Sequence, residues 1–113
     1  MISDEVCGNT HRVCVFELDR RVLELRDFAS TVAPGSESVR GCLYVATTER
    51  QPHEEYASQK WGRSANRFVK SYGISIRYDL FNDCPPMSLD EAKRMAVSRA
   101  AALRERGYAV WQR

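Results

Sequence analysis

A run of basic side chains without an intervening acid is the feature of this sequence with the clearest chemistry. No Asp or Glu occurs from Lys60 to Tyr78. At about 100° per residue, a helix through this stretch places its cations on one face and its apolar residues on the opposite face. Cations gathered on one face can hold a phosphate backbone, with an affinity that falls as salt rises. We therefore predict a nucleic-acid-binding face formed by Lys60, Arg63, Asn66, Arg67 and Lys70, in which Asn66 adds a neutral donor. The alternative is the solvated face that any amphipathic helix needs.

A second group of reactive side chains is the consecutive run His53, Glu54, Glu55 and Tyr56. A histidine with two carboxylates can bind a metal ion. However, adjacent residues of a helix point in different directions, and acids are favourable at a helix start for electrostatic reasons alone. We therefore keep His53 and Glu55 as weak catalytic candidates and predict neither a metal site nor a cofactor.

The four cysteines, at positions 7, 14, 42 and 84, show no metal-binding spacing. None lies in a C-x-x-C motif or beside a histidine, so a zinc site is not indicated. An even count allows two disulfides, but we expect free thiols, with Cys14 and Cys42 serving as small core residues. The alternative is that Cys14 and Cys42 face each other across neighbouring strands as a redox pair.

The composition is that of one small globular domain. The chain has 113 residues, is 43% hydrophobic, and carries a net charge of +2 from 17 basic and 15 acidic residues. This total is too small to indicate a nucleic-acid binder, so only the clustered cations argue for one. No apolar run approaches the roughly 18 residues of a membrane span, and the polar start does not resemble a secretory signal. We expect a cytoplasmic protein with a polar lead-in at 1–11, a single domain at 12–113 and no membrane contact.

The pattern of apolar residues and caps predicts the order β-β-β-α-α-β-α-β, a small α/β (α+β) sandwich. Three helices are expected: one that Pro52 opens and Gly62 ends, one that Ser64 caps and Gly73 closes, and one that begins with an S-x-x-E capping box at Ser88 and Glu91. The expected strands are 12–18, 22–26, 41–47, 74–78 and 108–111.

Four segments together resemble a known family. HRVCVFELD (11–19), RGCLYVATTERQP (40–52), NRFVKSYG (66–73) and RGYAVW (106–111) are similar to motifs of small bacterial GIY-YIG nuclease-like domains. The resemblance covers about Arg12 to Arg113. It implies a short, mostly antiparallel sheet flanked by three helices. These motifs belong to the scaffold, so they indicate fold more than chemistry.

The resemblance also implies a chemistry, the hydrolysis of phosphodiesters with one divalent metal. Family members use two strand tyrosines, a helix arginine, a helix histidine, and a glutamate on a late helix that carries the metal. A metal lowers the pKa of the attacking water, and fixed cations stabilise the charged transition state. In this sequence the corresponding positions hold Cys14 and Tyr44 for the tyrosines, Glu55 for the arginine, Gln59 for the histidine and Ala96 for the glutamate, while Ala46 replaces a glycine.

Of these positions only Tyr44 keeps the residue of the family pattern. Glu55 places a negative charge beside any bound phosphate, where the pattern has the positive charge of an arginine. The resemblance therefore favours a catalytically degenerate domain that binds DNA or another nucleic acid over an enzyme. One alternative is a protein-interaction module on the same scaffold, with a protein partner covering Tyr44 and Trp61. The other is an active endonuclease with relocated site residues, for which Mg²⁺ would be the cofactor.

Overall fold

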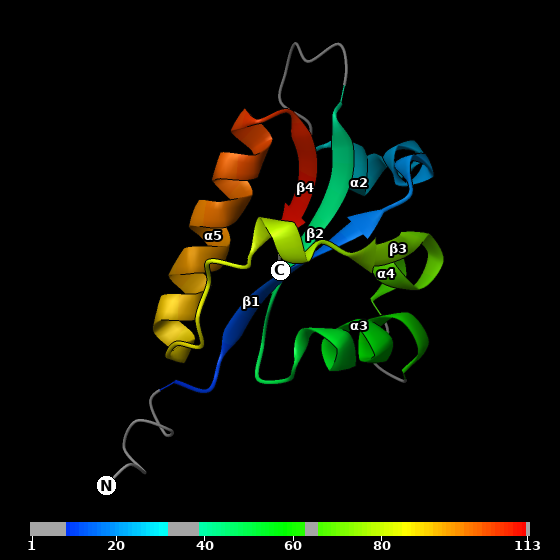
Figure 1. Cartoon of the computed structure of the whole chain (residues 1–113). Coiled ribbons are helices and arrows are strands. Elements are labelled where there is room, and N and C mark those ends of the chain that lie inside the picture. The colour runs from blue at the N-terminus through cyan, green and yellow to red at the C-terminus, as the bar shows by residue number, and fades with distance from the viewer. Residues whose placement is uncertain (1–8, 32–38, 63–65, 113) are drawn as a thin grey trace, which may run out of the picture.

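A four-stranded mixed sheet forms the centre of the protein (Figure 1). The computed structural model describes residues 9–31, 39–62 and 66–112. The strand order is β3-β1-β2-β4, in which β1 pairs antiparallel with β2 and β3, and β2 pairs parallel with β4. The strands are β1 (Arg12–Leu18), β2 (Gly41–Thr48), β3 (Gly73–Ile76) and β4 (Tyr108–Gln112). The predicted α/β class and mostly antiparallel sheet are confirmed.

Helices cover both faces of this sheet. Figure 1 shows α5 on one side and α2, α3 and α4 on the other, so β1 and β2 are covered on both faces. Their side chains are accordingly buried almost throughout, as an unbroken apolar run predicts. The α-helices are α2 (Arg26–Ala29), α3 (Pro52–Trp61), α4 (Arg67–Tyr72) and α5 (Leu89–Glu105), and the short 3-10 helices are η1 (Arg20–Glu24) and η2 (Tyr78–Leu80).

The strand predicted at 22–26 is wrong. The backbone turns at Asp19, whose side-chain oxygen accepts a hydrogen bond from the Arg21 N–H at 2.9 Å. Asp19 thereby caps η1, and α2 follows directly. Val22 is buried, whereas Leu23 and Leu25 pack only partly against the core. The described sheet therefore has four strands instead of five, and α2 adds a helix to the three expected.

Two other element boundaries differ from the prediction. The cap of α4 is Asn66, whose side-chain oxygen accepts from the backbone N–H of Phe68 at 2.9 Å; the predicted cap, Ser64, lies outside the described residues. The strand expected at 74–78 is β3, which ends at Ile76, because η2 begins two residues later.

The long helix α5 matches its prediction closely. Ser88 and Glu91 form the expected capping box, with the Ser88 hydroxyl accepting from the Glu91 N–H at 3.2 Å. Gly107 follows the helix with a φ of 99°, a conformation that favours glycine. The apolar face of α5 packs on the core: Ala92, Ala96, Ala100 and Leu103 are buried, and Met95 is partly covered.

The capping box gives a direct test of this helix start. Replacing Ser88→Ala removes the acceptor for the Glu91 N–H and should lower the free energy of unfolding by about 1 kcal/mol. The matched control is Ser98→Ala, an exposed position within the same helix, where alanine should leave stability unchanged or slightly higher. Urea denaturation of both variants measures the difference, and equal effects would contradict the assigned cap.

Candidate functional site

Tyr44, the one retained tyrosine of the family pattern, lies in the core. Its residue surface is 0% exposed, and its ring stacks on Phe16 with centroids 6.3 Å apart. Its hydroxyl accepts a hydrogen bond from the Asn66 amide at 3.2 Å. Asn66 therefore caps α4 with its oxygen and holds Tyr44 with its nitrogen. A substrate at the surface would not reach this tyrosine.

The neighbouring family positions are also filled by packed atoms. Cys14 pairs with Ala46 across β1 and β2, and both are buried. Ala96 is buried on α5, which covers the opposite face of the sheet (Figure 1). Within the described structure these positions, like Tyr44, are part of the core, so Tyr44 is not open to the protein partner that the interaction-module alternative would place on it.

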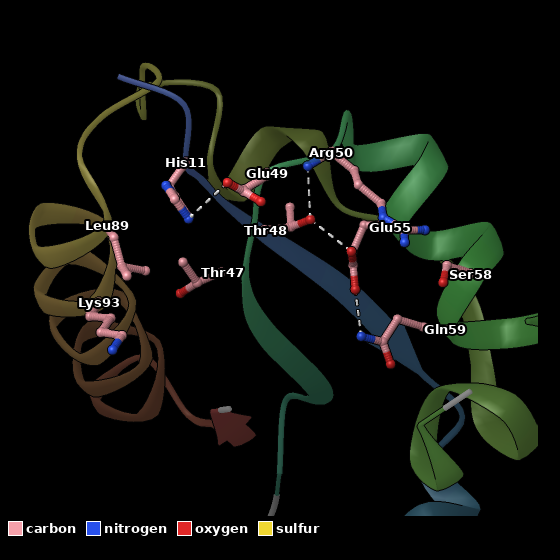
Figure 2. Close-up of a pocket in the computed structure, with 10 residues that line it drawn as sticks. All are labelled: His11, Thr47, Thr48, Glu49, Arg50, Glu55, Ser58, Gln59, Leu89 and Lys93. Atoms are coloured by element: carbon pink, nitrogen blue, oxygen red, sulfur yellow. Dashed lines mark hydrogen bonds and ion pairs between the residues drawn. The ribbon is translucent and has the colours of Figure 1, made fainter. Parts of the chain in front are cut away.

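A polar pocket of about 500 Å³ lies beside this buried region (Figure 2). It is bordered by the end of β2, by α3 and by the start of α5. Two of the family positions, Glu55 and Gln59, line it. The Glu55 carboxylate accepts from the Thr48 hydroxyl at 2.7 Å and from the Gln59 amide at 2.5 Å. In contrast, His53 is exposed and does not line the pocket.

His11 is a pocket residue that the sequence did not indicate. It was predicted to end a polar lead-in, but its backbone forms two hydrogen bonds with Met87, at 2.9 and 2.8 Å. Its Nε2 lies 3.7 Å from a carboxylate oxygen of Glu49, also at the pocket. The bridge joins residues far apart in the chain, so no local pattern could have revealed it.

The C-terminal turns of α3 and α4 carry Lys60, Trp61 and Lys70, of which Trp61 and Lys70 are exposed and Lys60 is partly buried. The Lys60 ammonium donates to the backbone carbonyl of Lys70 at 3.5 Å, which brings the two helix ends together. None of the described ion pairs involves either lysine. Trp61, the residue after Lys60, is 72% exposed, and its ring meets Tyr56 edge-to-face with centroids 6.1 Å apart. We call Lys60, Trp61 and Lys70 the Lys–Trp patch.

Arg67, from the predicted basic face, and Arg77, from the same acid-free segment, already have acidic partners. Arg67 pairs with Asp27, and its guanidinium lies 4.6 Å from the centre of the Phe68 ring. Arg77 forms ion pairs with Asp79 and with Glu17. These acids lie outside the acid-free segment from Lys60 to Tyr78. The sequence therefore suggested more unpaired cations in this segment than the structure shows. Arg63 lies outside the described residues.

Cys14, Cys42 and Cys84 are free thiols. The register places Cys14 opposite Ala46 and Cys42 opposite Leu18, so the alternative of a facing redox pair is wrong. Burial raises the pKa of the Cys14 thiol strongly, and the negative charge of Glu55 raises it further. Burial also raises the pKa of Cys42, to about 11. Both thiols are core residues, as predicted.

Comparisons of the chain with models of known protein families, with curated proteins and with solved structures found no match. The resemblance to GIY-YIG nuclease-like domains therefore rests on the quoted motifs. Among the described residues no helix is long and apolar enough to cross a membrane. Within the same part of the chain, no group of three or more histidine, cysteine or acidic side chains is arranged to hold a metal ion.

The raised pKa of Cys14 predicts a loss of stability in alkali. Below the ordinary thiol pKa, near 9, both folded and unfolded chains hold the proton. As pH rises above that value only the unfolded chain releases it, so the free energy of unfolding falls by up to about 1.4 kcal/mol per pH unit. Urea denaturation across the alkaline range should show a steeper fall for the wild type than for Cys14→Ala. Equal slopes would contradict the assignment.

Proposed function

We propose that this chain is a catalytically degenerate GIY-YIG nuclease-like domain that binds single-stranded nucleic acid through the Lys–Trp patch. The observation that carries the proposal is the exposed Trp61 ring at the end of α3, next in the chain to Lys60, whose ammonium reaches the backbone of Lys70; neither lysine has a described acidic partner. The family assignment rests on the sequence motifs, and the binding mode rests on the surface of α3 and α4.

The patch combines the two interactions that single strands offer. An exposed aromatic ring stacks on any base, for about 1–3 kcal/mol per base, and neighbouring cations follow the phosphates. Trp61 is the last residue of α3, and the ring of Tyr56, five residues earlier, packs edge-to-face against it. Lys60 directly precedes Trp61 in the chain, and its ammonium reaches the Lys70 carbonyl, so both lysines belong to the same end of the molecule as the exposed ring. Duplex DNA hides its bases, so this patch favours single strands.

The former catalytic positions support a binding protein over an active nuclease. Tyr44 is enclosed in the core, and Glu55 presents a carboxylate where the family pattern has an arginine. Near 5 Å, at an effective dielectric of about 20, a carboxylate and a phosphate repel by about 3 kcal/mol. A protein-interaction module is a weaker alternative, because of the two residues that its partner would cover, Tyr44 is buried and only Trp61 is exposed.

Fluorescence anisotropy with a labelled oligothymidylate tests the proposal. With two lysines releasing counterions, the logarithm of affinity should fall with the logarithm of salt with a slope of about −1.4. Trp61→Ala should weaken binding about tenfold through the lost stacking. Lys70→Gln should weaken binding and make the slope shallower by about 0.7.

The matched control is Lys93→Gln, which removes the same charge from an exposed position on α5. It should bind like the wild type. The proposal is wrong if the wild type does not bind at low salt, if Trp61→Ala binds normally, or if Lys93→Gln is as damaging as Lys70→Gln.

A further inference from the structure

Two buried side-chain oxygens without a hydrogen-bond partner border the same pocket. Within the described part of the chain these atoms are Thr47 Oγ1 and Gln59 Oε1, and no other buried side-chain nitrogen or oxygen lacks a partner. An unsatisfied buried polar group costs about 1–3 kcal/mol. Gln59 is only 3% exposed. Both residues border the pocket, Thr47 on the α5 side of β2 and Gln59 on the α3 side (Figure 2), and a polar occupant would supply the partner that each oxygen lacks.

The hydrogen bond to Glu55 fixes which end of the Gln59 amide is unpartnered. The nitrogen must donate to the Glu55 carboxylate, at 2.5 Å, so the oxygen is the end left over. Figure 2 shows Glu55 between Thr48 and Gln59, joined to both by hydrogen bonds. The wall of the pocket formed by α3 therefore presents hydrogen-bond acceptors, so a molecule bound there must supply hydrogen-bond donors.

The carboxylate of Glu55, on the same wall, forms no ion pair in the described structure. Both partners of Glu55, the Thr48 hydroxyl and the Gln59 amide, are neutral. The carboxylate is half-buried, where a charge needs pairing more than at the surface. The basic lining residues, Arg50 and Lys93, are exposed, so they belong to the rim.

We propose that this pocket binds a small organic cation, one that carries a guanidinium or primary ammonium group. Its N–H groups donate to the Glu55 carboxylate and to Gln59 Oε1, which lie together on the α3 side of the pocket, whereas Thr47 lies on the α5 side (Figure 2). The proposal does not depend on nucleic-acid binding, because neither Glu55 nor Gln59 belongs to the Lys–Trp patch.

Titration of ¹⁵N-labelled protein with agmatine, followed by NMR, tests this site. Agmatine carries both cationic groups, and it should shift the Gln59 side-chain amide signals in a saturable way. Glu55→Gln keeps the shape of the side chain but removes its charge, and should weaken binding at least about tenfold, the loss expected for one charge-assisted contact. Inorganic phosphate, the probe of opposite charge, should leave these signals unmoved.

The matched control is Glu54→Gln, the neighbouring exposed acid, which does not line the pocket. It should bind agmatine like the wild type, and a native-like spectrum of each variant excludes unfolding as the cause. The proposal is overturned if no saturable shift occurs up to tens of millimolar agmatine, or if Glu55→Gln binds as well as Glu54→Gln. It is equally overturned if phosphate binds instead, or if a crystal structure with agmatine shows only an ordered water at Gln59 Oε1.

Discussion

The antiparallel pairing of β1 with β2 is the constraint on which the rest of the molecule depends. The two strands pair without interruption from Arg12 opposite Thr48 to Leu18 opposite Cys42. Because helices cover both faces, a slip of one residue would exchange the side chains of the two faces and misplace every packing contact. The same register fixes Tyr44 against Phe16 and brings Thr48 to the end of β2, within reach of Glu55.

This pairing also determines what becomes of the positions where the GIY-YIG pattern has catalytic residues. Where the family pattern has a tyrosine and a glycine, Cys14 and Ala46 lie opposite each other and are sealed in the core. Tyr44 is held there by Asn66, which also caps α4. Two accessible surfaces lie around α3: the polar pocket that Glu55 lines, and the separate Lys–Trp patch that contains Trp61. We infer that these two surfaces bind different ligands.

Local signals in the sequence predicted most of the fold. The apolar runs of β1 and β2 and the capping box at Ser88 each depend on neighbouring residues, and each was confirmed. The segment 22–26 was assigned wrongly because its spaced leucines mimic strand alternation, whereas the Asp19 cap selects a 3-10 turn.

The candidate site was less predictable, because its contacts join distant residues. Asp27 neutralises Arg67 across 40 positions, and no local pattern shows that pairing. The bridge between His11 and Met87, and the place of Thr47 and Gln59 on the border of one pocket, likewise arise only when the elements pack. Glu55 was singled out in the sequence as a weak catalytic candidate and, with Gln59, as a position that departs from the family pattern. The hydrogen bond from Gln59 to Glu55, which leaves the Gln59 oxygen without a partner, could not be read from that pattern.

The most direct test of the account is the footprint of a short oligothymidylate on the NMR spectrum of the ¹⁵N-labelled protein. The account places the bound strand at the ends of α3 and α4, away from the pocket. It predicts that the Trp61 indole signal and the amide signals of Lys60 and Lys70 move together, while those of Thr48 and Glu55 stay in place. A footprint centred on Thr48 and Glu55, or a spectrum that does not change, would contradict it.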